Sequence, residues 1–282
     1  MKIGIIGAGK VGTSLGKYLR ENGAEVSGFC SKTRQSAADA AEFTDTTCFD
    51  EQEDLISASD TIFITTPDGE IKRAWDRIAK YDIRGKIVCH FSGSLSSEVF
   101  SDIRSTGAHG CSFHPIYAFS DRFSSYKKFD TARITAEGDP EAVILLRALF
   151  EGCGNKVMTV ASSEKTRYHA ATVFASNMVV GLLRSSVDLL NSCGFSDEDA
   201  YSIIGPLTKN NVDSVFSRGC AESLTGPVER NDIQTVASHI ADLSRSAGTE
   251  AELAIYKDIK SKLVELARQK NPDRDYTQME EL

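Results

Sequence analysis

The chain opens with Met1-Lys-Ile-Gly-Ile-Ile-Gly-Ala-Gly-Lys-Val-Gly12, and this stretch decides its fold. An apolar, strand-like run leads directly into the pattern G-x-G-x-x-G, and Leu15 and Leu19 then continue at helical spacing. In this strand–turn–helix setting the first glycine permits a tight turn. The second lets the backbone approach a pyrophosphate, and the third lets the helix pack closely on the strand. The free amides of the helix N-terminus favour phosphates. The predicted contacts of a dinucleotide are Gly7, Ala8, Gly9, Lys10, Val11 and Gly12.

The choice between NAD(H) and NADP(H) depends on the residues that follow the second predicted strand. An NAD(H) site would place an aspartate or glutamate there to bind the ribose hydroxyls. The chain instead continues Cys30-Ser-Lys-Thr-Arg34, which offers hydroxyl groups and positive charge, and arginine binds phosphate in a bidentate manner. The pattern favours NADP(H), although a solvated basic turn would have the same composition. The predicted contacts of the 2′-phosphate are Ser31, Lys32 and Arg34.

Short β-rich runs alternate with helical patterns through the first half of the chain. This alternation predicts an α/β fold with right-handed βαβ units, and hence a doubly wound Rossmann domain over residues 1–161. Ligands of this fold bind at the carboxyl ends of the strands, where Thr66, Pro67 and Ser92 are therefore further predicted cofactor contacts. The predicted strands are Lys2–Ile6, Glu25–Phe29, Thr61–Thr65, Lys86–Phe91, Gly110–Phe113, Arg133–Ala136 and Lys156–Val160.

Residues 162–282 contain no strand pattern and predict an all-helical domain for the substrate and for dimerisation. One long helix, Ser163–Asn191, is apolar over much of its circumference. Such a helix needs partners on every side, and so small a domain supplies too few of them. We therefore expect a homodimer that forms through the C-terminal helices. The polar segment Gln269–Leu282 is expected to be mobile.

The composition argues against several classes of function. The 282 residues suffice for two domains, and a net charge of -8 argues against nucleic acid as a partner. The seven cysteines are scattered without a C-x-x-C pair, which is typical of reduced cytosolic thiols. No basic segment precedes the first apolar run, and no stretch of about 18 apolar residues occurs, so we expect neither a signal peptide nor a membrane span. The expected location is the cytoplasm.

Five short motifs carry a resemblance to a known family. They are His90-Phe-Ser-Gly-Ser-Leu-Ser, Ser112-Phe-His-Pro, Tyr168-His-Ala-Ala, Ala175-Ser-Asn-Met and Leu224-Thr-Gly-Pro-Val-Glu-Arg-Asn-Asp. In this order they resemble a family of NADP oxidoreductase-like proteins that pair a Rossmann-like domain with an all-helical domain of uncharacterised function. Its wider relatives are 6-phosphogluconate dehydrogenase and pyrroline-5-carboxylate reductase. The resemblance covers most of the chain except the tail. It implies this fold, an NADP(H) cofactor and often a helix-exchanged dimer, but no substrate.

One departure from these relatives concerns a catalytic lysine. Related β-hydroxyacid dehydrogenases carry a lysine four residues before an asparagine of the long helix. Relative to Asn177, that place holds Val173. The lysine general acid of that class is therefore absent at this place, and the fold alone does not make the chain a β-hydroxyacid dehydrogenase.

Hydride transfer to a carbonyl or imine needs a proton donor near the reacting heteroatom, and histidine titrates in the useful range. His114 follows a strand end, where Pro115 rigidifies the turn, so it is the first catalytic candidate. A structural histidine bonded to a loop backbone is the alternative. His169 and Asn177 are the other catalytic candidates, because they lie eight residues apart and would share a helical face. Asn177 lies among apolar residues and needs a partner, which is substrate, cofactor or another helix.

Thr225 and Arg230 are the candidates for binding the substrate, because an arginine beside this Thr-Gly-Pro turn can hold a carboxylate. An exposed charge, or an ion pair with Asp232, is the alternative for Arg230. No histidine, cysteine or carboxylate cluster has metal-ligand spacing, so no metal is expected. The sequence thus predicts an NADP(H)-dependent oxidoreductase for a small carbonyl, imine or hydroxy substrate bound between the domains. A non-catalytic NADP(H)-binding sensor is the alternative, and the absent lysine motivates it.

Overall fold

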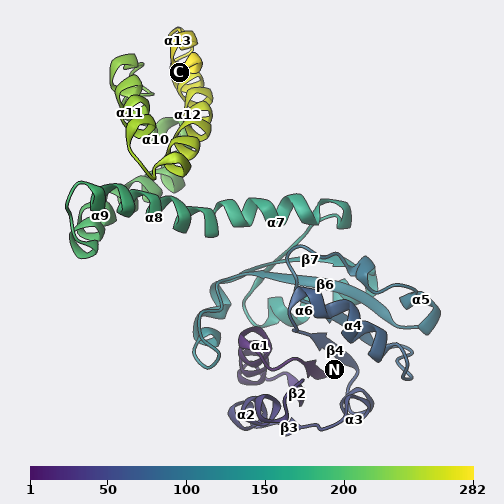
Figure 1. Ribbon diagram of the computed structural model, residues 1–282. Helices are drawn as coiled ribbons and strands as arrows, with labels where there is room; N and C mark the ends of the chain where they lie inside the picture. The colour runs from purple at the N-terminus through teal and green to yellow at the C-terminus, as the bar shows by residue number, and fades with distance from the viewer. The chain divides into compact units, whose positions relative to one another are not determined.

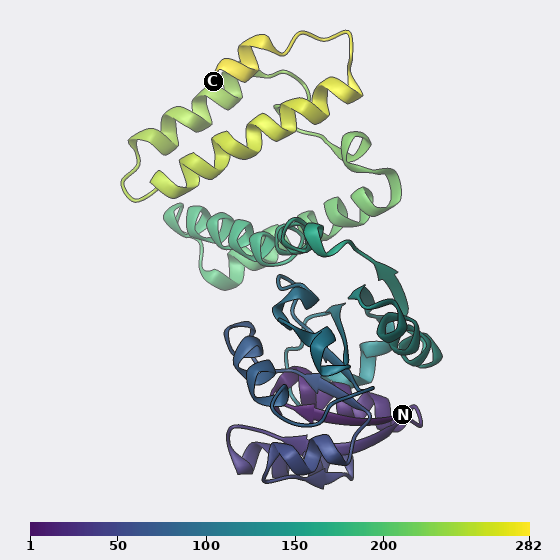
Figure 2. The ribbon, with the colours of Figure 1, turned by 90° about the vertical axis from the view of Figure 1, so that its right-hand side faces the viewer.

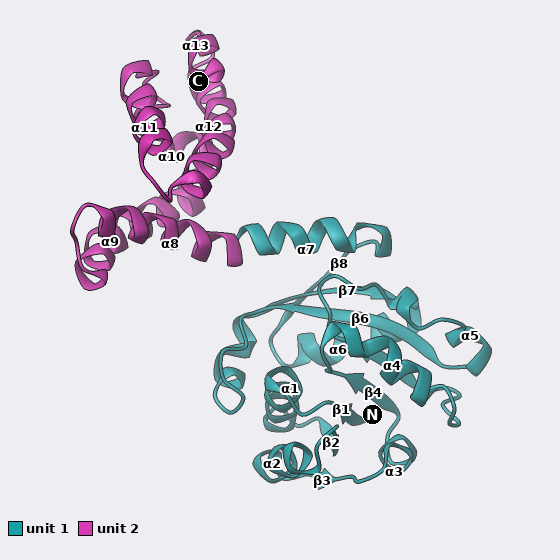
Figure 3. Cartoon of the chain, viewed as in Figure 1, with its two compact units in different colours: residues 1–176 teal, residues 177–282 magenta.

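The computed structural model describes residues 1–282 and divides into two compact units, Met1–Ser176 and Asn177–Leu282 (Figures 1 and 3). The domain boundary predicted after residue 161 follows the last strand. The units divide later, so helix α7 (Lys165–Phe174) belongs with the first unit. This position matters for the site, because α7 carries residues that pack against the strands.

An eight-stranded sheet forms the centre of the first unit, in the order β3-β2-β1-β4-β5-β6-β7-β8. Neighbouring strands are parallel except for the antiparallel pair β6 and β7. The predicted doubly wound α/β fold is therefore confirmed, with one strand, β3, that was not predicted because it has only two residues. The strands are β1 (Lys2–Ile6), β2 (Glu25–Cys30), β3 (Thr47–Cys48), β4 (Thr61–Ile64), β5 (Ile87–His90), β6 (His109–Ile116), β7 (Arg133–Gly138) and β8 (Lys156–Thr159).

Helices cover both faces of this sheet, and each face has its own core (Figures 1 and 2). Successive strand residues point to opposite faces, so Phe63 packs with α1, α2 and α6 while Ile62 and Ile64 pack with α3 and α4. The continuous apolar strands are thus explained by burial on both sides. The helices of this unit are α1 (Lys10–Glu21), α2 (Arg34–Thr44), α3 (Gln52–Ser57), α4 (Asp68–Ile78), α5 (Ile103–Thr106), α6 (Pro140–Gly152) and α7, with 3-10 turns η1 (Ser97–Val99), η2 (Ser125–Thr131) and η3 (Ser162–Glu164).

The second unit is all-helical, as predicted. Its N-caps at Ser196 and Asp232 accept hydrogen bonds from the backbone amides of Asp199 and Thr235, each at 3.1 Å. The helices are α8 (Asn177–Ser192), α9 (Asp197–Arg218), α10 (Cys220–Ser223), α11 (Ile233–Arg245), α12 (Glu250–Lys270) and α13 (Thr277–Glu281).

The prediction of one unbroken helix over Ser163–Asn191 is wrong. A turn at Ala175 and Ser176 separates α7 from α8. Just before this turn, the hydroxyl of Thr172 donates to the carbonyl of His169, and the hydroxyl of Ser176 donates to that of Thr172. Side-chain bonds of this kind compete with the helical ladder and bend it. The predicted common face of His169 and Asn177 therefore does not follow from helical spacing.

The prediction of a mobile C-terminal tail is also wrong. Tyr276 and Met279 are 1% and 0% exposed and pack in the core of the second unit. The ammonium of Lys260 donates to the carbonyls of Met279 and Glu280, and Arg268 forms an ion pair with Glu280. Two apolar residues, Tyr276 just before α13 and Met279 within it, are enough to dock this segment, although its composition is polar.

Large apolar side chains remain exposed on the helices that follow the sheet. Among them, Phe174, Val180, Leu207 and Phe216 are 62%, 68%, 61% and 87% exposed. By length and composition the stretch Ser162–Ser192 could also cross a membrane, with a mean hydropathy of 1.3 in its most apolar window. One such stretch is weak grounds for a membrane span, because core helices of other proteins meet the same criterion. The homodimer expected from the sequence would cover such side chains, and it stays a prediction.

Candidate active site

The glycine turn between β1 and α1 has the geometry that its sequence predicts. Gly7 has φ +107°, a conformation that favours glycine, and its amide donates to the carbonyl of Cys30 at 2.9 Å. A Cβ on Gly12 would lie 2.2 Å from the carbonyl oxygen of Gly7 and 2.4 Å from the hydroxyl of Thr65. A Cβ on Gly9 would meet no atom within 4 Å. The turn is therefore closed on the side of the strands and open at Gly9, where α1 begins.

The end of β2 carries the predicted 2′-phosphate residues, all of which are at least partly exposed. Lys32 and Arg34 are exposed, Ser31 is half-buried, and α2 begins at Arg34 without an acidic residue in its first turn. Sequence reasoning found no acid at this strand end, but the fold brings one from β3. The Nε atom of Arg34 donates to the carboxylate of Asp50 at 2.6 Å. No local signal reveals this pair, since it depends on the place of β3 in the sheet.

The loops after β4 and β5 form the next part of the same edge. The hydroxyl of Thr66 is buried and has no hydrogen-bond partner, while the exposed Pro67 precedes α4. The hydroxyl of Ser92 donates to the carboxylate of Asp68 at 2.7 Å and accepts bonds from the amides of Ser94 and Leu95. The Ser92 side chain therefore shapes its own loop, and the free polar atom on this edge is that of Thr66.

Strand register aligns the carboxyl ends of β1, β4 and β5 with the middle of β6. Ile6, Ile64, His90 and Ser112 are aligned across β1, β4, β5 and β6. Ala8, Thr66 and Ser92 follow the ends of β1, β4 and β5. The prediction that His114 follows a strand end is wrong, because β6 continues through His114 to Ile116. Strand β6, which carries His114, lies three strand spacings from β1, about 14 Å at ~4.8 Å per strand. A ligand that spans this edge from the turn reaches the neighbourhood of His114.

His114 contacts helix α7 through an aromatic cluster. Its Nδ1 atom lies 2.8 Å from the hydroxyl of Tyr168, and its ring centroid lies 5.8 Å from that of His169. A Cβ on Gly93 would lie 2.3 Å from the His169 ring and 2.8 Å from Nε2 of His114, so only glycine fits between the loop and both rings. The structure therefore brings the predicted His114 and His169 together. It adds Tyr168, which the motif Tyr168-His-Ala-Ala contained without an assigned role.

Burial fixes the protonation states of His114 and Tyr168 near neutral pH. It lowers the pKa of His114 to about 4, with further lowering by the nearby charges of Lys165 and His169. Burial also raises the pKa of the Tyr168 phenol. At neutral pH the imidazole is thus uncharged and the phenol keeps its proton, so the pair shares one hydrogen bond between two neutral groups.

A buried lysine that sequence reasoning missed lies behind this pair. Lys165 is 1% exposed, and its ammonium donates to the carbonyl of Ser92 at 2.8 Å and to the hydroxyl of Ser112. Burial lowers its pKa to about 8, and the charge of Glu137 opposes that shift. Lys165 joins α7 to β5 and β6, and thereby holds Tyr168 over the strand edge. Lys165 lies four residues before His169, so the two share one face of a helix, and this spacing could have indicated that Lys165 lies near the site.

His90 has a structural place below this edge. It is fully buried, its Nδ1 atom accepts a bond from the amide of Ser92, and its Nε2 atom lies 3.1 Å from the carbonyl of Ser96. Burial lowers its pKa to about 4, with the charge of Lys165 as the second cause. Both ring nitrogens are occupied by the backbone, so His90 supports the Ser92 loop.

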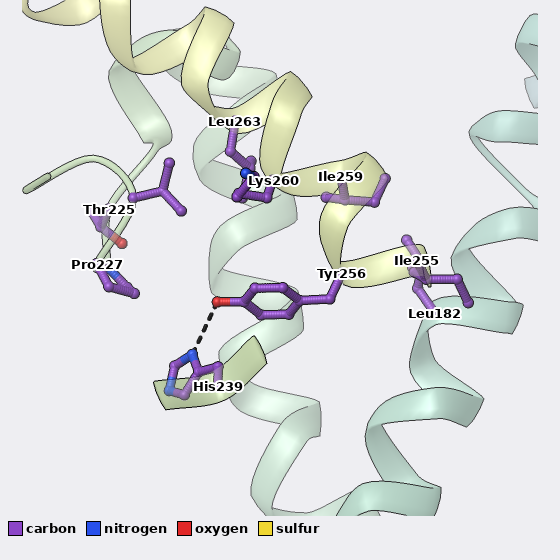
Figure 4. A pocket seen from close by; sticks show the side chains of 10 residues that line it. Leu182, Thr225, Pro227, His239, Ile255, Tyr256, Ile259, Lys260 and Leu263 are labelled. Atoms are coloured by element: carbon purple, nitrogen blue, oxygen red, sulfur yellow. Dashed lines mark hydrogen bonds between the residues drawn. The ribbon is translucent and has the colours of Figure 1, made fainter. Parts of the chain in front are cut away.

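The remaining predicted residues, Asn177, Thr225 and Arg230, belong to the second unit. Thr225 lines a cavity of about 400 Å³ whose other walls are mostly apolar, with the hydrogen-bonded pair His239 and Tyr256 at one side (Figure 4). Arg230 is exposed and forms no ion pair with Asp232, which instead caps α11. The catalytic candidates that the structure brings together are therefore those of the first unit.

Comparisons with known proteins agree with this arrangement of domains. Residues 1–115 match the model of the Rossmann-like domain family, and residues 132–263 match that of a domain of unknown function, DUF2520. A search among curated proteins finds no match.

Several solved structures are similar to the chain over most of its length. Protein TM1727 from Thermotoga maritima is 25% identical, with a TM-score of 0.76 over 95% of this chain and 98% of that chain. An imine reductase from Pseudomonas sp. is 16% identical, with a TM-score of 0.65 over 95% and 97%. A reductive aminase from Aspergillus terreus, in complex with NADPH and ethyl-5-oxohexanoate, is 13% identical, with a TM-score of 0.66 over 99% and 97%. The similarity to the two reductases is one of fold.

Proposed function

We propose a reductase function for this chain, which belongs to the proteins that join a Rossmann-like domain to a DUF2520 domain. In this proposal NADP(H) binds along the edge from the glycine turn to the β5 loop, and a small carbonyl, imine or hydroxy compound is the second substrate. The observation that carries the proposal is the Tyr168–His114 pair, which stands on the same strand edge as an open dinucleotide turn. An imine reductase and a reductive aminase share the fold, which supports reductase chemistry in general.

The residues of the edge fit a nicotinamide dinucleotide. The open space at Gly9 admits a pyrophosphate to the N-terminus of α1. The hydroxyl of Thr66 is buried and has no hydrogen-bond partner in the chain, so it can bond to a polar group of the dinucleotide. Lys32 and Arg34 at the end of β2, with the N-terminus of α2, support the 2′-phosphate of NADP(H) over NAD(H).

The chemistry divides between the cofactor and the chain. A bound reduced nicotinamide supplies the hydride for the carbon of a C=O or C=N bond. The heteroatom of that bond then needs a proton, which neutral His114 is poorly suited to supply because its pKa is about 4. We assign the proton to the hydroxyl of Tyr168, in the tautomer where Nδ1–H of His114 donates to the phenol oxygen and leaves the phenol proton for the substrate. Water then returns the proton to the phenolate. Lys165 takes no part in the proton transfer. It positions Tyr168 and the Ser92 loop through its hydrogen bonds to Ser92 and Ser112.

Single-turnover oxidation of NADPH tests this function. The protein is mixed with NADPH and a panel of keto acids, aldehydes and imines, and loss of the reduced nicotinamide is followed by absorbance. We expect NADPH to bind and at least one substrate class to oxidise it. Tight binding without turnover across the panel would favour the non-catalytic NADP(H)-binding sensor instead.

We also propose that the protein is a cytoplasmic homodimer. Its seven cysteines are free, which suits a reducing compartment. The exposed apolar side chains of α7 to α9 support a second copy as their cover, since soluble monomers rarely expose large apolar patches.

Sedimentation velocity is expected to give twice the mass of the 30.7 kDa chain. The substitution Val180→Lys would place a charge on the apolar face of α8 and should convert the protein to a monomer. Ile144→Lys is the matched control, because Ile144 is 66% exposed on α6 in the other unit, close to the 68% of Val180. A wild type that sediments as a monomer would contradict the proposal.

A further inference from the structure

Strand β3 brings an acidic residue to the end of β2, and one glycine makes this possible. Gly28 has φ +150°, and a Cβ there would lie only 1.9 Å from the carbonyl oxygen of Thr47. Without a side chain at Gly28, β3 lies directly beside β2. The amide of Phe49 then donates to the carbonyl of Phe29 at 2.8 Å, which continues the pairing beyond β3. The next residue, Asp50, therefore stands beside the segment that follows β2.

At that place Asp50 forms an ion pair with the arginine predicted to bind the 2′-phosphate. The Nε atom of Arg34 lies 2.6 Å from the Asp50 carboxylate, and the two side chains are 77% and 61% exposed. The guanidinium has five N–H donors, and the structure shows no other hydrogen bond from it. Its two terminal amino groups are thus free for a phosphate, while its charge is already shared with a carboxylate.

We propose that Asp50 sets the preference between NADPH and NADH, an inference that rests on the proposed function. A 2′-phosphate bound to Arg34 would lie close to the negative charge of Asp50 and would share the guanidinium with it. A ribose 2′-hydroxyl is instead attracted to Asp50, because it can donate a hydrogen bond to the carboxylate. Asp50 therefore weakens NADPH binding, favours NADH, and keeps the discrimination between the two cofactors small.

Titration calorimetry with NADPH and NADH tests this assignment. For Asp50→Asn we expect the dissociation constant for NADPH to fall about fivefold and that for NADH to rise about threefold. For Arg34→Ala we expect NADPH to bind about tenfold more weakly and NADH to be unaffected. The gain in NADPH affinity for Asp50→Asn should be smaller in high salt, since salt screens the repulsion between the 2′-phosphate and the exposed Asp50 carboxylate.

The control variant is Asp45→Asn, which removes the same charge from another exposed acid–arginine pair. Asp45 lies at the other end of α2, 3.5 Å from Arg20, and asparagine tolerates its positive φ of 55°. It should change neither dissociation constant. The fragment 2′,5′-ADP, compared with 5′-AMP, should repeat the effect of Asp50→Asn without the nicotinamide half.

The outcomes separate this inference from the proposed function. If the wild type binds both cofactors and Asp50→Asn leaves their ratio unchanged, the inference is overturned. If Asp50→Asn weakens NADPH as Arg34→Ala does, Asp50 only orients the arginine, and the inference is again overturned. A wild type that binds neither cofactor overturns the proposed function itself.

Discussion

Tyr168→Phe is expected to slow single-turnover hydride transfer about 100-fold and to leave the dissociation constant of NADPH unchanged. The substitution removes one oxygen atom, which lies 2.8 Å from Nδ1 of His114. It thereby removes the proposed proton donor, and the heteroatom of the substrate would have to take its proton from water. The glycine turn lies three strands away in the sheet, so cofactor binding should not respond. The measurement uses the substrate that oxidises NADPH fastest in the panel.

The second unit offers a matched control for this variant. Tyr256 forms the same kind of pair with His239, whose Nδ1 atom lies 2.9 Å from its hydroxyl. Tyr256→Phe should keep the rate within about twofold of the wild type. This substitution removes only an ordinary hydrogen bond and no proposed proton donor. A Tyr168→Phe protein that retains the wild-type rate would remove Tyr168 from the chemistry. A change confined to cofactor affinity would do the same.

Gly12→Ala is expected to weaken NADPH binding at least 100-fold and to destabilise the first unit by about 3 kcal/mol. The new methyl group would lie 2.2 Å from the carbonyl oxygen of Gly7, an atom of the backbone that cannot rotate away. Helix α1 would have to move outward, and its N-terminus would leave the position that suits a pyrophosphate. Thermal unfolding should show a midpoint lower by roughly 5–10 °C, and calorimetry should show the loss of affinity.

Alanine substitutions at two other glycines serve as controls that separate the effect on folding stability from the effect on NADPH binding. A Cβ on Gly9 meets nothing within 4 Å, so Gly9→Ala should fold with wild-type stability and still weaken NADPH by obstructing the phosphate. A Cβ on Gly69, in α4, also meets nothing, and Gly69→Ala should change neither quantity. Wild-type affinity in Gly12→Ala would show that the close packing of α1 is dispensable.

Local patterns predicted the parts of the fold that local forces determine. The glycine turn and the buried strands each follow from a few neighbouring residues, and the structure has them. The turn between α7 and α8 was missed because hydroxyl groups of Thr172 and Ser176 bend a helix whose apolar pattern continues. The docked tail was missed because two buried side chains in a polar segment give too weak a periodicity.

The missed parts of the site depend on contacts between distant segments. Asp50 meets Arg34 only because β3 pairs with β2, and no spacing rule connects those residues. Lys165 meets the carbonyl of Ser92 only after α7 packs on the strand ends. The motif Tyr168-His-Ala-Ala places Tyr168 beside His169, but the hydrogen-bonding partner of Tyr168, His114, lies 54 residues away.

The place of the unit boundary has a consequence for how such proteins diversify. Residues 1–176 contain His114, Gly93, Lys165 and Tyr168 with all the hydrogen bonds that position them. The hydrogen bonds of the proposed proton donor, Tyr168, and of Lys165 therefore all lie within the first unit. Under the proposed function, substitutions in the helical unit could change its partners while these contacts are inherited with the sheet.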